Sequence, residues 1–411
     1  MQAVILVGRL GSPVKRRPKP LLEVAGRPFI EHYLLNLRRF GFDRFLLIAE
    51  QASAGVKEVI GPGTAFARSL NADVKVVVEP QAMGTGGALA YARDHLAQSY
   101  LLTNGDTFFD FNVLDLTLTR QPSWLGRIAL RRVPDARRSG LVEARDGRVT
   151  GFLKKPASAV GGLTNGGVYW LKREVAERIT EFSCSLEADI FPVLAQEGRL
   201  ECAEYTGLLV EIGEPEGLAR AEPILLSALR RPAVFLDRDD TLNHDAGYTH
   251  KIEDFRWVAG VPELIKRLND AGVLVFVVSN QSGVARGYYG VGEVEALHRW
   301  MNADLMRIGA HIDDFRFCPH HPQGQVPEYS KVCGCRKPQP GMIDELLARW
   351  SLDRARCLMI GDKETDAEAA RRAGIAGIAV PTGGLAKPLE AFLESHGARA
   401  QAPQPSPRRG R

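Results

Sequence analysis

Five polar side chains in the second half of the chain have the types and spacing that hydrolysis of a phosphate monoester requires. They are Asp237, Asp239, Ser279, Lys337 and Asp362. Asp237 can attack phosphorus and form an aspartyl-phosphate, and Asp239, two residues on along an extended chain, can protonate the leaving oxygen. Ser279 and Lys337 can bind the oxygens of the phosphoryl group. Asp237 and Asp362 can hold Mg²⁺, which prefers oxygen ligands, so these residues predict a magnesium-dependent phosphatase.

A second group of residues has the spacing of a structural zinc site. Cys318 and His320 form one pair, and Cys333 and Cys335 form another twelve residues later. Four such ligands on two turns can close a tetrahedron around Zn²⁺ and leave no open position for catalysis. His321 is the alternative to His320, although the Cys-x-His spacing mirrors Cys-x-Cys. We expect this site to hold in place the loop that follows the last cysteine.

The elements that must position these groups are short apolar segments, which are typical of buried strands. AVFL precedes Asp237, VLVFVV precedes Ser279 and CLMIG precedes Asp362, with helical segments between them. Ligands bind at the carboxyl ends of the strands in an open α/β sheet, so we expect the five polar groups to converge. The same alternation begins with AVILV near the N-terminus. It predicts an α/β protein with two doubly wound, mainly parallel-sheet domains, the first, 1–228, of Rossmann type and the second, 229–390, carrying the zinc loop. A disordered basic tail, 391–411, is expected to follow.

The motifs DRDDT, SNQSG, RKP and GDKETD occur in the order that is typical of the haloacid dehalogenase-like phosphatases, which this half of the chain resembles. The resemblance implies that Asp237 is the nucleophile and Asp239 the general acid, with the backbone carbonyl of Asp239 also binding Mg²⁺. It implies that Ser279 and Lys337 stabilise the phosphoryl group and that Asp362 is a metal ligand.

Asp240 departs from this pattern, because the family usually has glycine before the threonine. Its carboxylate would weaken the binding of phosphate by repulsion if it faced the site. The alternative is that its side chain points into a cap interaction. In either case we expect activity to survive.

Residues 233–385 more specifically resemble the D-glycero-D-manno-heptose 1,7-bisphosphate phosphatases, through HDAGYTH, SNQSGVARG, CPHHPQG, CRKPQPGM and GDKETD. The histidinol-phosphate phosphatases have a zinc loop of this kind and remain an alternative. The resemblance implies removal of the 7-phosphate, with Arg336 binding the second phosphate. The implied substrate contacts are Asp245, Ala246, Gly247, Tyr248, Ser279, Asn280, Gln281, Ser282, Arg336 and Lys363.

In the first half of the chain, a loop after the first strand has residues suited to binding a triphosphate. Gly8, Gly11 and Ser12 could let backbone amides approach phosphates, and Lys19 adds positive charge. Further along, Asp106 and Glu211 are two carboxylates that could share Mg²⁺ in nucleotidyl transfer.

The segments EPQAMGTGGALA, TNGD, LKKP, TNGGVYW, SLEAD and EIGEPEG make residues 1 to about 225 similar to the sugar-phosphate nucleotidyltransferases. The resemblance implies that the first loop and Lys19 bind a triphosphate and that Asp106 binds metal. It places two groups of residues near the base and the sugar phosphate. These are Gln81, Gly84 and Thr85 for the base, and Lys155, Asn165, Gly166, Glu187 and Asp189 for the sugar phosphate.

This half departs from its family's pattern at several positions. Arg9 stands in place of a glycine, Pro13 in place of an arginine, Lys154 in place of an acid and Glu211 in place of an aspartate. Two interpretations therefore remain open: an active transferase, or a degenerate module that binds sugar. The nucleotide is expected to be GTP, by similarity to the heptose 1-phosphate guanylyltransferases. Adenylyl transfer and a mannose 1-phosphate substrate are alternatives.

The composition excludes some other classes of function. Of 411 residues, 53 are basic and 49 acidic, and the net charge of +4 comes from four arginines in the last thirteen residues, so nothing indicates nucleic-acid binding. No apolar run approaches the roughly 20 residues of a membrane span, and we expect no secretory signal. We therefore expect a cytoplasmic, bifunctional enzyme whose partners are sugar phosphates and a nucleotide. Its product would feed lipopolysaccharide, capsule or S-layer glycan synthesis, and the oligomeric state stays open.

Overall fold

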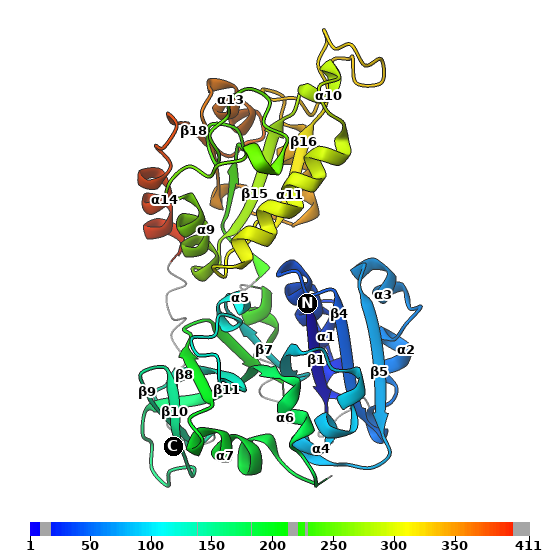
Figure 1. Ribbon diagram of the computed structural model, residues 1–411, viewed down its shortest axis with the longest axis vertical. Coiled ribbons are helices and arrows are strands. Elements are labelled where there is room, and N and C mark those ends of the chain that lie inside the picture. The colour runs from blue at the N-terminus through cyan, green and yellow to red at the C-terminus, as the bar shows by residue number, and fades with distance from the viewer. Residues whose placement is uncertain (9–17, 138, 182, 213–220, 227–228, 398–411) are drawn as a thin grey trace, which may run out of the picture. The chain divides into compact units, whose positions relative to one another are not determined.

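The computed structural model describes residues 1–8, 18–137, 139–181, 183–212, 221–226 and 229–397. The chain divides into two compact units, an N-terminal unit, Met1–Ala228, and a C-terminal unit, Leu229–Arg411 (Figure 1). Each unit combines a β-sheet with helices, which confirms the predicted α/β class. No helix in the described ranges has both the length and the apolar character needed to cross a membrane.

The sheet of the N-terminal unit has nine strands in the order β5-β4-β1-β6-β11-β8-β12-β10-β9. The first four strands of that order are parallel. Antiparallel pairing begins where β11 joins β6, so the sheet is mixed rather than mainly parallel. The strands are β1 (Gln2–Val7), β4 (Arg44–Glu50), β5 (Asp73–Glu79), β6 (Ser99–Asn104), β8 (Gly126–Val133), β9 (Leu141–Arg145), β10 (Arg148–Leu153), β11 (Gly162–Lys172) and β12 (Leu200–Glu204).

The antiparallel pairing in the second half of this sheet has a local cause. Between β9 and β10, Asp146 and Gly147 both have positive φ, 52° and 76°. Two such residues form the tight turn that joins antiparallel strands with the correct twist. Antiparallel strands need no helical crossover between them, so the alternation seen in the first hundred residues does not continue here.

Helices cover the N-terminal sheet, and two further strand pairs lie beside it. One face packs Val4 and Leu6 of β1 against α4, α6 and α7 in a single apolar cluster. The helices are α1 (Phe29–Arg39), α2 (Val56–Ile60), α3 (Ala65–Leu70), α4 (Gly84–Tyr91), α5 (Val113–Leu116), α6 (Arg173–Glu177) and α7 (Phe191–Gln196). The pairs are β2 (Glu23–Val24) with β3 (Arg27–Pro28), and β7 (Thr107–Asp110) with β13 (Leu208–Glu211).

The C-terminal unit has a five-stranded sheet in the order β16-β15-β14-β17-β18, and every pair in it is parallel. The chain runs outward from β14 to one side and then returns to add strands on the other, which is the doubly wound topology predicted for this half. The strands are β14 (Ala233–Leu236), β15 (Leu274–Asn280), β16 (Asp314–Cys318), β17 (Cys357–Gly361) and β18 (Ala376–Ala379).

Alternate residues of β14 face opposite layers of helices, as the period of a strand requires. Val234 and Leu236 pack with α9, α11 and α14, whereas Ala233 and Phe235 pack with α12 and α13. The helices are α9 (Val261–Asp270), α10 (Gly283–Arg286), α11 (Val291–Met306), α12 (Gly341–Arg349), α13 (Glu364–Arg372) and α14 (Ala386–Phe392).

The end of this unit differs from the unstructured tail predicted from residue 391. Helix α14 and the following turn, Leu393–Gly397, extend into that stretch. Leu389 and Phe392 are buried in the same core as α9, so packing stabilises a segment whose composition alone did not indicate a helix. Residues 398–411 lie outside the described residues.

Candidate functional site

Two of the predicted phosphatase residues meet at the carboxyl end of β14. Asp237 follows this strand, and its N–H donates to the carbonyl of Ile360 on the neighbouring strand at 3.0 Å. The Nζ atom of Lys337 lies 2.8 Å from Asp237 Oδ1 and 2.6 Å from Asp366 Oδ1. It also donates to the carbonyl of Val278 at 2.8 Å. One ammonium group therefore contacts the residue after β14, a backbone carbonyl of β15 and the first turn of α13.

Lys337 is almost completely buried, so its charge depends on these partners. Burial alone would lower the pKa of Lys337, but Asp237 and Asp366 together raise it above its usual value. Its backbone is held as well, because Asn280 donates to the Lys337 carbonyl and accepts from the Lys337 N–H, both at 3.0 Å. The lysine therefore stays charged and fixed in position beside the predicted nucleophile.

Asp239 lies in a network of buried hydrogen bonds. It accepts from Arg238 Nε at 2.9 Å, from Arg238 Nη2 at 3.1 Å and from Gln281 Nε2 at 2.8 Å. Gln281 Nε2 also donates to Ser279 Oγ at 2.8 Å, and Tyr289 donates to Gln281 Oε1 at 2.9 Å. Burial raises the pKa of Asp239, and Arg238 opposes part of that shift. Gln281 thus connects two predicted catalytic side chains.

Three carboxylates near Lys337 are placed to hold a metal ion. Asp237, Asp362 and Asp366 each offer an oxygen within 4.8 Å of the others. Asp362 Oδ1 is buried without a hydrogen-bond partner, and Lys363 Nζ lies 3.1 Å from the other oxygen. A buried carboxylate oxygen that lacks a hydrogen-bond partner and lies close to other carboxylate oxygens is suited to binding Mg²⁺, which prefers oxygen ligands.

Asp366 is the residue of this cluster that sequence reasoning missed, although the GDKETD motif contains it. It reaches the site from the first turn of α13 rather than from a strand end. A side chain at Gly361 would not fit, because its Cβ would clash with the Asp366 carboxylate.

The Asp240 carboxylate contacts the neighbouring loop that contains Asp245. Asp240 Oδ1 accepts the N–H of Asp245 at 3.2 Å. The Asp245 carboxylate in turn accepts from the Thr249 N–H at 2.9 Å and from its hydroxyl at 2.7 Å. Burial would raise the pKa of Asp245, but these hydrogen bonds bring it below its usual value. Asp240 therefore connects the first motif to the loop that was expected to contact substrate.

This contact predicts different effects for two substitutions of Asp240, whose φ of 57° suits asparagine and glycine. Asp240→Asn keeps the acceptor oxygen, so the KM for the substrate expected from the sequence, heptose 1,7-bisphosphate, should stay within about twofold. Asp240→Gly removes the acceptor, and losing a bond of ~1 kcal/mol should raise that KM about fivefold. Steady-state kinetics of both variants provide the measurement. A KM that falls in both variants would show instead that the charge of Asp240 repels the substrate.

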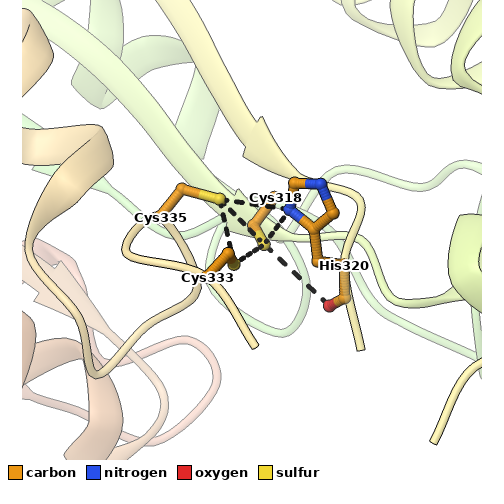
Figure 2. Close-up of side chains that lie close together, drawn as sticks. All are labelled: Cys318, His320, Cys333 and Cys335. Atoms are coloured by element: carbon orange, nitrogen blue, oxygen red, sulfur yellow. Dashed lines mark hydrogen bonds between the residues drawn. The ribbon is translucent and has the colours of Figure 1, made fainter. Parts of the chain in front are cut away.

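Figure 2 shows the predicted zinc ligands drawn together at the end of β16. The Sγ atoms of Cys318, Cys333 and Cys335 lie 3.2–3.5 Å apart, and His320 Nδ1 lies 3.4 Å from Cys335 Sγ and 3.7 Å from Cys318 Sγ. A tetrahedral zinc site with Zn–S bonds of 2.3 Å has sulfur atoms about 3.8 Å apart, so these atoms, a few tenths of an ångström closer together, are grouped as the ligands of one such ion would be. His321 Nδ1 instead accepts a backbone N–H at 3.1 Å, which favours His320 as the ligand.

The remaining residues that were expected to contact the heptose substrate lie in loops near this end of the sheet. Arg336 Nη1 donates to the carbonyl of His320 at 3.2 Å, so this arginine contacts the cysteine-rich loop. Tyr248 is 40% exposed. Ala246 and Gly247 are also exposed, and Ser282 immediately precedes α10.

In the N-terminal unit, three of the predicted charged residues lie around β7. Lys19 Nζ is 3.9 Å from Asp106 Oδ2, and Asp106 immediately precedes this strand. Glu211 lies opposite Thr107 in the pairing of β13 with β7. The structure thus brings a lysine and two carboxylates to one short ribbon.

A second group in this unit consists of polar side chains joined by hydrogen bonds. Thr85 donates to Glu187 Oε2 at 2.8 Å, Tyr169 donates to Glu187 Oε1 at 3.1 Å, and Asn165 donates to the Tyr169 hydroxyl at 2.9 Å. Tyr169 is buried and was missed by sequence reasoning, although it is part of the TNGGVYW segment. It holds together two residues that were expected to contact the sugar phosphate.

The other predicted residues of this unit have varied surroundings. Asp189 accepts the N–H of Ser185 at 2.8 Å. Gly166 has no room for a side chain, because a Cβ would lie 2.7 Å from the Phe109 ring. Gly84 begins α4, and the carbonyl of Gly8 accepts a hydrogen bond from Ser53. Gln81 and Lys155 are exposed. Gly11 and Ser12 lie outside the described residues.

Comparisons with known proteins agree with this division. The nucleotidyl transferase family model matches residues 2–223, and the HAD-hydrolase-like family model matches residues 334–403. The D-glycero-beta-D-manno-heptose-1,7-bisphosphate 7-phosphatase of Rhodopseudomonas palustris is 50% identical over 151 residues, which are 37% of this chain and 84% of that protein. The D-glycero-alpha-D-manno-heptose-1,7-bisphosphate 7-phosphatase of Photorhabdus laumondii is 43% identical over 141 residues, covering 34% of this chain and 77% of that protein. Among solved structures, HddC from Yersinia pseudotuberculosis is 24% identical with a TM-score of 0.47, and the match covers 55% of this chain and 99% of that one.

Proposed function

The chain belongs to the nucleotidyl transferase family through its N-terminal unit and to the D-glycero-D-manno-heptose-1,7-bisphosphate 7-phosphatases through its C-terminal unit, and from this we propose that it catalyses two successive steps on one sugar. The C-terminal unit removes the 7-phosphate from heptose 1,7-bisphosphate. The N-terminal unit transfers a nucleotidyl group, with GTP favoured, to the heptose 1-phosphate that remains. Both anomers occur among the substrates in the relatives' names, so either could be the substrate here.

The phosphatase half of the proposal depends on one observation, the position of Lys337 between Asp237 and Asp366. An Asp237 oxygen forms a bond to phosphorus while the bond from phosphorus to the sugar oxygen breaks. Asp239 gives its proton to that leaving oxygen, and Lys337 and Ser279 bind the phosphoryl oxygens. Water then hydrolyses the aspartyl-phosphate, releasing inorganic phosphate and restoring the carboxylate.

Two metals belong to this proposal. Asp237, Asp362 and Asp366, with the backbone carbonyl of Asp239, would hold Mg²⁺, which neutralises charge on the phosphoryl oxygens when bound. Cys318, His320, Cys333 and Cys335 would hold a structural Zn²⁺. Cysteine clusters that bind zinc rather than form disulfides are typical of a reducing compartment, so the proposal includes a cytoplasmic location.

The transferase half is supported by the contact of Lys19 with Asp106 and by the hydrogen-bonded group around Glu187. Asp106 and Glu211 would bind a metal ion, and Lys19 the triphosphate. Asn165 and Glu187 would bind the sugar phosphate, and Thr85, which donates to Glu187, would lie near the base. An oxygen of heptose 1-phosphate attacks the α-phosphorus of the nucleotide, and pyrophosphate leaves.

Replacing Asp106 with asparagine tests this half. Heptose 1-phosphate is supplied with GTP, ATP, CTP or UTP, and release of pyrophosphate is measured. The wild type should release most pyrophosphate with GTP, and Asp106→Asn should lower kcat by about 10²-fold or more, since it loses a charged group at the reacting centre. Asp94→Asn, which changes an exposed aspartate of the same unit, is the control. Failure of the wild type with all four nucleotides would instead support a degenerate binding module.

A further inference from the structure

Two tyrosines of the C-terminal unit expose their rings beside each other. Tyr248 is 40% exposed and Tyr288 is 55% exposed. Their ring centroids lie 4.9 Å apart at an interplanar angle of 78°. Edge-to-face contact of this kind is favourable and gives two rings a defined arrangement. The phosphatase chemistry described above gives Tyr288 no role.

The segment carrying Tyr288 is attached to the phosphatase site. Tyr288 follows α10, which Figure 1 shows near the end of β16, and its N–H donates to the carbonyl of Gly283 at 2.9 Å. The next residue, Tyr289, donates to Gln281, and Gln281 donates to both Asp239 and Ser279. Tyr288 is therefore adjacent in the chain to a residue that supports the predicted acid.

The segment that carries Tyr248 also contacts the residues that support Asp239. The carbonyl of Thr249 accepts from Arg238 Nη2 at 2.6 Å, and Arg238 also holds Asp239. The ring of His250 stacks on Tyr289, with centroids 4.5 Å apart and an interplanar angle of 17°. The two segments thus contact each other and share their attachment to Asp239.

The backbone at Tyr248 also indicates a constrained position. Tyr248 has a φ of 59°, and Gly247 before it has a φ of 103°. A bulky side chain rarely adopts positive φ, and such conformations persist where the surrounding structure holds them, often at ligand sites. Asp245, which accepts both hydrogen bonds from Thr249, supplies that hold. The exposed ring is therefore kept in place rather than buried in the core.

We propose that Tyr288, together with Tyr248, forms an aromatic wall beside the phosphatase site that packs against the ring of the substrate. This wall would make Tyr288 a specificity-determining residue for phosphate esters whose alcohol contains a ring. A sugar ring presents C–H groups on its faces, and burying that apolar surface against an aromatic ring is favourable. The inference rests on the proposed phosphatase function, since it assigns the side chain that recognises the leaving group of that reaction.

The test compares a substrate that has a ring with one that has none. Heptose 1,7-bisphosphate and acetyl phosphate are hydrolysed by the wild type, Tyr288→Ala and Tyr288→Phe. Tyr288→Ala should raise the KM for heptose 1,7-bisphosphate about tenfold, which corresponds to ~1.4 kcal/mol, with kcat within about twofold. Its kinetics with acetyl phosphate should not change. Tyr288→Phe keeps the ring and should restore the wild-type KM.

A matched control and a second probe separate the possible failures. Tyr91→Ala removes a tyrosine of similar exposure, 42%, from the N-terminal unit and should change neither reaction. An unchanged KM in Tyr288→Ala, or an equal loss with acetyl phosphate, would overturn the aromatic wall. If the wild type hydrolyses acetyl phosphate but not heptose 1,7-bisphosphate, the proposed substrate is wrong. In that case p-nitrophenyl phosphate is the ring-containing probe, and the same comparison of KM values decides the role of Tyr288.

Discussion

Replacing Asp237 with asparagine is expected to lower phosphatase kcat by at least about 10³-fold while the chain stays folded. The side chain keeps its size but loses the oxygen anion that attacks phosphorus, and removal of a nucleophile costs rates of this order or more. The fold should survive because Lys337 retains its contacts with Asp366 and with the carbonyl of Val278. Inorganic phosphate released from heptose 1,7-bisphosphate provides the measurement, and far-ultraviolet circular dichroism checks the fold.

Asp254→Asn is the matched control for that experiment. It makes the same change at an exposed aspartate of the same unit and should keep wild-type turnover. Trapping of a phosphorylated chain after acid quenching should succeed in the wild type and fail in Asp237→Asn. Retention of more than a tenth of the turnover in Asp237→Asn would contradict the assignment of Asp237 as nucleophile.

The centre of the C-terminal sheet could be predicted from sequence because β14, β15 and β17 are buried on both faces. Such strands appear as short continuous apolar runs, and a polar residue directly after a run marks a carboxyl end. Asp237 and Asp362 both occupy such positions, after β14 and β17. Asp366 does not, since it lies in the first turn of α13, where a carboxylate is also a common helix-start residue. Only the fold of the chain brings it next to Lys337.

The N-terminal sheet was predicted less completely because it mixes parallel with antiparallel pairs, and these mostly join strands far apart in the chain. β6 pairs with β11, whose first residue lies more than fifty positions later, and no local pattern in either strand indicates the partner. The hydrogen bond of Tyr169 to Glu187 also forms only when the chain folds, and no local pattern indicates it. The hydrogen bond of Asp240 to Asp245 is likewise a contact that no sequence pattern indicated.

Loss of one ligand from the cysteine-rich cluster is the second large effect that we expect. The purified chain should contain one zinc ion, and Cys335→Ser should lose it. The loop between Cys318 and Lys337 contacts the phosphatase site at both ends. The carbonyl of Cys318 accepts from the Gln281 N–H at 2.8 Å, and the backbone of Lys337 pairs with Asn280. Release of the loop should therefore displace Lys337 and lower phosphatase kcat by about 10²-fold or more.

The expected loss of stability is roughly 3 kcal/mol or more in the C-terminal unit. Zinc supplies about 10–16 kcal/mol to small peptides that have no other core, whereas this unit has two apolar clusters of its own and should remain folded. Cys357→Ala is the matched control, because it removes a buried thiol of the same unit outside the cluster and should keep the zinc. Elemental analysis, thermal unfolding and phosphate release are measured on all three proteins. Equal zinc content in Cys335→Ser and Cys357→Ala would contradict the metal site. Loss of zinc without loss of turnover would keep the site but show that Lys337 is held by Asn280 and the two aspartates alone.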